Sequence, residues 1–189
     1  MFNQTSVYIN QESGLVVMES EVEQSDTFNP KIPTDRLCSI NWCTEGSIAV
    51  YAKNMTLVDT YGVAERMMIT NPDHLRFGKC LLVCTSETAK YYCLHNNNSQ
   101  AIYYDGEVIQ LGANEERTIS GCNGHFMFCS LGNVEGASVN VDEITGMISV
   151  GIANSLGKYD LATIDSHSYV VTAGAEGAII TVFHDSTDD

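Results

Sequence analysis

The sequence is short of basic residues. Only 9 of its 189 residues are Lys or Arg, against 24 Asp or Glu, which gives a formal net charge of −15. Binding to a phosphate backbone or to an anionic membrane surface relies on basic side chains. The balance therefore argues against a nucleic-acid partner and against a membrane partner, and we expect the charge to keep the protein in solution.

Long apolar runs are also lacking. No segment approaches the roughly 20 apolar residues of a membrane span. Met1–Asn10 has neither the basic start nor the apolar run of a secretory signal. We therefore expect an intracellular protein, either cytoplasmic or part of a virion. The seven cysteines are an odd number in a chain long enough to bury a core without bridges, so we interpret them as reduced core residues.

Motifs for catalysis and for metal binding are missing as well. The chain has no His-x-His pair and no glycine pattern of a nucleotide-binding loop. Asp165, Ser166 and His167 are adjacent, but catalytic triads are assembled in space, so we interpret this run as a turn. The closest cysteine pairs lack the two-residue spacing of a zinc knuckle: Cys38/Cys43, Cys80/Cys84 and Cys122/Cys129. We expect no catalytic residue, no metal and no cofactor, and the balance favours a protein that is not an enzyme.

What the sequence does contain is short apolar runs separated by glycine and asparagine turns every 8–12 residues. This spacing predicts an all-β, mainly antiparallel fold: a β-sandwich, a jelly roll or a barrel, with at most one or two short helices. The one helix candidate is Tyr61–Ile69, in which Val63 and Met67 have helical spacing. We find no internal repeat of fixed period. The clearest strand candidates are Ser47–Ala52, Met55–Val58, Cys80–Thr85 and Lys90–His95.

The domain organisation follows from composition. Residues 1–36 are expected to form an N-terminal arm, or a small hairpin of Val7–Ile9 with Leu15–Met18, followed by an extended linker. Residues 37–184 are expected to form the β-sandwich domain. Residues 185–189 are expected to be a disordered acidic tail.

Four turns are predicted to close hairpins. Asp105-Gly106 is a type I′ signal within 100–111, and Asn123-Gly124 is a second, which would place Ile119 opposite Phe128. Thr145-Gly146 would join Ser138–Ile144 to Met147–Ile152. Gly174–Gly177 would join two paired strands, 168–173 and 178–183.

Aromatic residues on two neighbouring strands are the candidates for contact with a partner. Tyr91, Tyr92, Ala101, Tyr103 and Val108 are expected at an interface, because a hairpin that is apolar on both faces favours a sandwich or a neighbouring subunit. Alternatively, the tyrosines stack on a small ligand or a glycan.

The function favoured by these observations is that of a non-enzymatic structural or interaction protein. It would assemble with itself as a homo-oligomer, or with an assembly partner. The patterning is similar to that of small β-rich proteins of virus particles, such as capsid decoration or tail components, although no motif carries that likeness. Two alternatives stay open: a small-ligand or glycan-binding β module, and a β-barrel enzyme whose site has no sequence signature.

Overall fold

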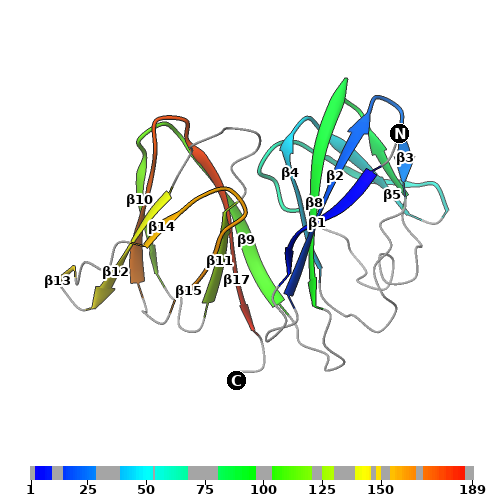
Figure 1. The fold of residues 1–189 in the computed structure, drawn as a ribbon. Coiled ribbons are helices and arrows are strands. Elements are labelled where there is room, and N and C mark those ends of the chain that lie inside the picture. Colours follow the sequence, from blue (N-terminus) through cyan, green and yellow to red (C-terminus); the bar gives the residue numbers. More distant parts are fainter. Residues whose placement is uncertain are drawn as a thin grey trace. The chain divides into compact units, whose positions relative to one another are not determined.

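The computed structural model describes residues 3–9, 15–28, 39–52, 54–67, 81–96, 104–120, 125–129, 139–145, 148–149, 154–164 and 168–185. Regular structure in these ranges consists of β-strands in antiparallel sheets, and no helix occurs in them (Figure 1). The expected all-β, jelly-roll or barrel fold is therefore confirmed. The helix expected at Tyr61–Ile69 is wrong in its described part, because Tyr61 ends a strand and the residues up to Met67 form a turn and an extended segment.

The structure falls into two compact units, which we call the N-terminal unit (1–104) and the C-terminal unit (105–188). This grouping differs from the division expected at residue 36. Residues 29–38 and 186–189 lie outside the described residues, so the extended linker and the acidic tail stay predictions.

The N-terminal unit consists of two antiparallel sheets. One has the strand order β1-β2-β8-β4 and the other β3-β7-β5-β6. The strands have the following bounds: β1 (Asn3–Ile9), β2 (Leu15–Glu23), β3 (Thr27–Phe28), β4 (Ser39–Glu45), β5 (Ile48–Tyr51), β6 (Leu57–Tyr61), β7 (Leu81–Cys84) and β8 (Thr88–Asn96). The hairpin expected near the N-terminus is present, since Ile9 of β1 lies opposite Val16 of β2.

Strand β8 is the centre of the first sheet, between β2 and β4 (Figure 1). Its inward residues join the core between the two sheets, and its outward residues are just as buried. All six residues from Ala89 to Leu94 are at most 3% exposed. This explains why the sequence here lacks the alternation of a strand that faces water on one side.

The C-terminal unit also consists of two antiparallel sheets. One has the order β9-β17-β11-β15 and the other β10-β16-β12-β13, with β14 pairing with β12 as well. The strands have the following bounds: β9 (Tyr104–Leu111), β10 (Glu116–Ser120), β11 (His125–Cys129), β12 (Val139–Thr145), β13 (Ile148–Ser149), β14 (Asn154–Leu156), β15 (Leu161–Ile164), β16 (Ser168–Ala173) and β17 (Ala178–Asp185).

The two units repeat one strand order. Apart from the extra edge strands β1 and β15, the order β2-β8-β4 corresponds to β9-β17-β11. The order β3-β7-β5-β6 corresponds to β10-β16-β12 with β13 and β14, which both pair with β12. The strands β2 and β9 pair with the last strands of their units, β8 and β17, and the chain passes repeatedly between the two sheets, which is the winding of a jelly roll. The repeat is one of topology, which explains why no fixed sequence period is visible.

One turn recurs at matching places in both units. It connects β2 to β3 and β9 to β10, and it also follows β6 and β14. The N–H of its first residue donates to the carboxylate of its fourth, at 2.6–3.1 Å, and its third residue has a positive φ of 56–67°. The four turns are Glu23–Asp26, Gly62–Glu65, Gly112–Glu115 and Gly157–Asp160.

The hairpin predicted at Asp105-Gly106 is wrong. Both residues lie inside the continuous strand β9, which runs beside β17. A Cβ atom on Gly106 would lie 2.2 Å from the carbonyl oxygen of Val182 and 2.8 Å from the Cα of Phe183. The glycine is therefore needed for the close approach of two strands, which is a different use from a tight turn.

Two further pairings need correction. Strands β10 and β11, on either side of Asn123-Gly124, belong to different sheets, so Ile119 does not pair with Phe128. Strands β16 and β17 are joined by a turn, in which the Gly177 N–H donates to the Gly174 carbonyl, but they also belong to different sheets. The third hairpin is confirmed in its described part, since β12 pairs with β13.

Candidate ligand site in the N-terminal unit

Polar side chains lie in the interior of the N-terminal unit, where a core is expected to be apolar. Ser20 on β2 lies opposite Tyr91 on β8, and Asn41 on β4 lies opposite Cys93, also on β8. All four residues are at most 1% exposed. Because side chains alternate along a strand, these positions share the inward face with Val22 and the rest of the core. We call Ser20, Asn41, Tyr91 and Cys93 the interior polar cluster.

Hydrogen bonding within the cluster is uneven. The Tyr91 hydroxyl donates to Asn41 Oδ1 across the sheet. The Ser20 hydroxyl is fully buried and has no hydrogen-bond partner among the described residues. Burying a hydroxyl without a partner costs roughly 1–3 kcal/mol in protein mutational data. Such a group in a native interior requires an explanation, and an additional bound molecule is one.

Two buried thiols are neutral, one beside the cluster and one in the C-terminal unit. Burial, with a smaller contribution from nearby Cys84, raises the pKa of Cys43 to about 12. In the C-terminal unit, burial and the charge of Asp160 raise the pKa of Cys129 to about 12. Both side chains therefore stay protonated at neutral pH, and neither is a ready nucleophile or metal ligand. The described cysteines are buried and none of them forms a disulfide, as expected: Cys43, Cys84, Cys93 and Cys129.

The repeated fold allows the two interiors to be compared residue by residue. The carbonyl of Cys43 accepts from the N–H of Ala64, and the carbonyl of Cys129 accepts from the N–H of Tyr159, each the third residue of its turn. Cys43 and Cys129 are therefore equivalent. Cys43 lies opposite Tyr91, and Cys129 lies opposite Ile180.

From this equivalence the counterparts of the whole cluster follow. Asn41 and Met127 each lie two residues before the matched cysteine, so they are equivalent. Their cross-strand partners, Cys93 and Val182, are therefore equivalent too. Ser20 lies six residues before Asp26, as Ile109 lies six before Glu115, the last residues of matched turns. The counterparts are thus all apolar and all belong to one hydrophobic core: Ile109, Met127, Ile180 and Val182. The same scaffold is therefore stable without polar groups at these positions.

The outward face of the same sheet carries a second group of contacts. Trp42 stacks on Tyr92 with ring centroids 5.5 Å apart, and the Tyr92 hydroxyl donates to Glu19 Oε2 at 2.5 Å. Lys90, whose side chain is 3% exposed, lies 3.5 Å from the Glu21 carboxylate. These pairs are cross-strand neighbours, which makes them part of the sheet's own stabilisation.

The interface residues expected from the sequence are only partly visible. Tyr91 and Tyr92 are fully buried, on opposite faces of β8, and Val108 is half-buried on β9. Ala101 and Tyr103 lie outside the described residues. Their role at an interface, and the homo-oligomer itself, stay predictions.

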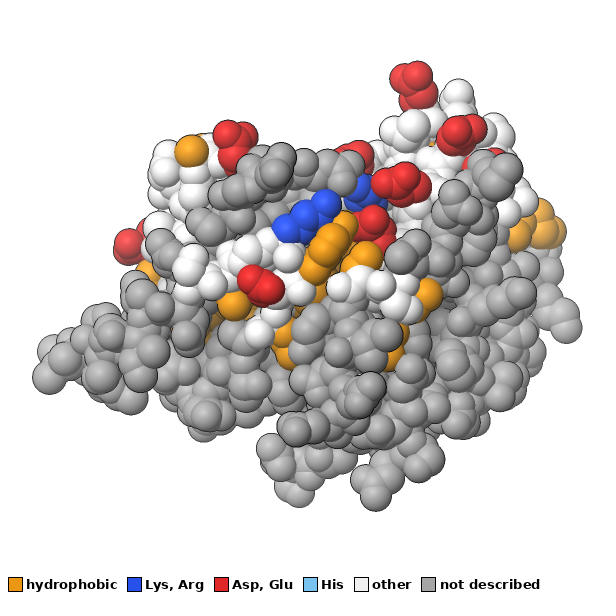
Figure 2. Space-filling view, viewed as in Figure 1, with side chains coloured by type: hydrophobic (Ala, Val, Ile, Leu, Met, Phe, Trp, Pro, Cys, Tyr) orange, Lys and Arg blue, Asp and Glu red, His pale blue; other side chains and the backbone are white. Residues whose placement is uncertain are grey.

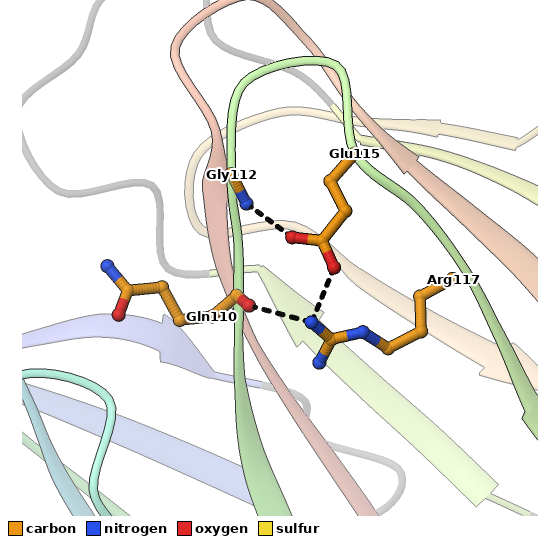
Figure 3. Close-up of polar contacts among 4 residues, drawn as sticks. All are labelled: Gln110, Gly112, Glu115 and Arg117. Carbon is orange, nitrogen blue, oxygen red and sulfur yellow. Dashed lines mark hydrogen bonds and ion pairs between the residues drawn. The ribbon is translucent and has the colours of Figure 1, made fainter.

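The surface reflects the shortage of basic residues. Figure 2 shows acidic side chains spread over the described part of the viewed face, with few basic ones among them. Arg117 donates to Glu115 Oε1 at 2.5 Å and to the carbonyl of Gln110, while the Gly112 N–H donates to the other oxygen of Glu115 (Figure 3). The Gly112 hydrogen bond, followed by Arg117, lowers the pKa of Glu115. None of the described residues forms a helix long and apolar enough to cross a bilayer.

No protein-family model matches the sequence, and no curated protein is similar to it. Solved structures do share its fold. A conserved protein of unknown function from Pseudomonas aeruginosa has a TM-score of 0.58 at 9% identity, covering 92% of this chain and 81% of that one. The 11S allergen of Cocos nucifera has 0.56 at 9%, covering 93% and 82%. The bacterial pirin YhhW of Escherichia coli, solved with nickel(II), has 0.53 at 11%, covering 97% and 92%.

These structures have cupin-like, jelly-roll barrel folds, and this chain shares that fold. The expectation of a virion subunit is wrong, because the similar structures are cupin-fold proteins such as a pirin and a seed allergen. At such low identity the likeness shows the fold alone.

The nickel ion of the pirin does not fit the interior polar cluster. The cluster offers a serine hydroxyl, a neutral amide, a phenol and a buried thiol, whereas divalent nickel prefers imidazole and anionic ligands. Among the described residues, no group of three His, Cys, Asp or Glu side chains could hold a metal ion. We therefore assign no metal to this site.

Proposed function

We propose that this chain is a cupin-like protein that binds a small organic molecule inside its N-terminal unit, against the interior polar cluster. The observation that carries the proposal is the Ser20 hydroxyl, fully buried and without a hydrogen-bond partner among the described residues. A bound molecule that hydrogen-bonds to Ser20 would remove the cost of this burial.

The apolar counterparts in the C-terminal unit support the proposal. The four matched positions there are filled by Ile109, Met127, Ile180 and Val182, which all belong to the hydrophobic core of that unit. Retaining Ser and Asn at these positions in the N-terminal unit costs stability relative to that solution. Positions where a protein keeps polar residues in its core, at a cost in stability, are expected to be functional.

Native mass spectrometry of the purified chain tests the proposal. We expect the native mass to exceed the mass of the denatured chain by that of one small molecule. Ser20→Val should lose this excess, because it removes the hydroxyl and fills its space. Thr181→Val is the matched control, since Thr181 is also a buried hydroxyl without a partner among the described residues, but lies in the other unit.

The proposal fails on a clear pair of results. The first result is a native mass equal to the mass of the denatured chain. The second is an unchanged Tm when the low-molecular-weight fraction of a cell extract is added to the protein. Equal loss of the mass excess in Ser20→Val and in Thr181→Val would also contradict it, because the effect would then not be specific to the cluster.

A further inference from the structure

The interior polar cluster consists of side chains without a formal charge: Ser20, Asn41, Tyr91 and Cys93. The acidic residues of β2 that flank Ser20 are Glu19 and Glu21, and the alternation of the strand places both on the outward face. Glu19 accepts from Tyr92 and Glu21 lies beside Lys90, also outward. Neither glutamate therefore brings a formal charge to the interior polar cluster.

One thiol beside the cluster is neutral, and one hydroxyl within it is a donor. The Cys43 thiol is protonated, and the Tyr91 hydroxyl acts as a hydrogen-bond donor to the Asn41 amide. A carboxylate or an ammonium group placed against this cluster would be removed from water without an opposite charge. The penalty for an unpaired buried charge exceeds what one or two hydrogen bonds return.

The hydrogen-bonding chemistry of the cluster is nevertheless specific. The Ser20 hydroxyl offers one donor and two acceptor positions, so it can serve a hydroxyl or a carbonyl equally well. In the C-terminal unit, Ile109 stands at the matched position and offers neither. A ligand with a hydrogen-bonding group would find no side-chain partner at that one position.

We infer that the N-terminal unit takes one uncharged molecule per chain, bearing a hydroxyl or carbonyl group bound by Ser20. This inference rests on the proposed function, and it names the chemical class and the stoichiometry of the ligand.

Matched probes that differ only in charge test the inference. The full chain is titrated with propanol, propionate and propylamine, and with benzyl alcohol, benzoate and benzylamine, and binding is followed by saturation-transfer NMR. We expect the neutral member of at least one set to bind with one site per chain. The charged members should bind about 100-fold more weakly or not at all, because their charge would be unpaired. Ser20→Val should abolish binding of the neutral probe, whereas Thr181→Val should leave it unchanged.

The failures are distinguishable. Charged probes that bind as tightly as the neutral ones, and lose binding in Ser20→Val, overturn the neutral class but leave a ligand site in place. Two sites per chain overturn the stoichiometry. Binding of no probe overturns the inference, and the native mass then decides the proposed function separately. Ser20→Ala, which adds no volume, replaces Ser20→Val if the latter unfolds, as judged by circular dichroism.

Discussion

The hydrogen bond between Tyr91 and Asn41 gives the most informative perturbation. Tyr91→Phe removes one hydroxyl from a fully buried ring and takes a donor from an equally buried amide oxygen. Depriving a buried acceptor of its donor costs about 1–3 kcal/mol. For a unit of this size, with a urea m-value of about 1–2 kcal/mol/M, the unfolding midpoint should fall by roughly 1 M.

A second substitution isolates the bond itself. Asn41→Leu removes the acceptor and approximates Met127, the apolar counterpart in the C-terminal unit. We expect the double variant Tyr91→Phe/Asn41→Leu to lose about 1–3 kcal/mol less free energy of unfolding than the two single variants lose together. The reason is that neither partner is then left without its hydrogen bond.

The assay is urea unfolding at pH 7, followed by tryptophan fluorescence. Trp42 is the one tryptophan of the chain, is fully buried, and adjoins Asn41 on β4, so it reports on this unit. Tyr92→Phe is the control. It removes a hydroxyl from the next residue, but its acceptor Glu19 is half-buried and can be hydrated again, so the loss should be smaller. Strictly additive costs for Tyr91 and Asn41 would refute the reasoning.

Four further outcomes are expected. Gly106→Ala should lower Tm sharply, because its Cβ would lie 2.2 Å from the backbone oxygen of Val182. The loss should exceed that of a Gly→Ala change at a glycine with open space around it, and an unchanged Tm would contradict the close approach. The pKa of Glu115 is lowered in the folded chain, so its carboxylate stabilises the fold above the ordinary pKa of a glutamate. This stabilisation is lost as the pH falls through the lowered pKa of the folded chain. Glu115→Gln should therefore flatten the fall of Tm between pH 5 and pH 3. Cys43 and Cys129 should escape iodoacetamide in the native protein at pH 8 and react in urea, as peptide mapping would show; fast native labelling would argue against their burial. Thr181→Val should raise the free energy of unfolding by up to about 1 kcal/mol, since it removes a buried hydroxyl without a partner among the described residues, and a loss of stability would point to a bond through water.

The sequence predicts the class of fold because alternation and turn residues are local properties. It does not predict which strands pair. A tight turn such as Gly174–Gly177 reverses the chain, but in a jelly roll the next strand enters the opposite sheet. Gly106 shows a second ambiguity, because a glycine serves a turn and a close approach equally well, and only the neighbour β17 decides between them.

The candidate site was missed for a related reason. Asn41 did carry a signal, as the polar residue between the apolar residues Ile40 and Trp42 of β4. Ser20 carried none, because glutamates on both sides suggest a solvated segment. Its burial depends on the pairing of β2 with β8, which local patterning does not encode.

The duplicated topology also had a weak signal. Three of the four recurring turns share the pattern Gly-x-x-Asp/Glu, at Gly62, Gly112 and Gly157. The pattern is short and occurs by chance in many chains. It becomes meaningful once the carboxylate is seen to close each turn on its first N–H group.

The burial of β8 on both faces limits how this protein can evolve. From residue 89 to residue 94 there is no side on which a new bulky or charged side chain could escape to water. A substitution at one of these positions requires a compensating substitution on the neighbouring strand β2 or β4. We therefore expect residues of β2, β4 and β8 to change together during evolution. The same six amides should be among the last to exchange with deuterium, because they can open only when the sheet itself comes apart.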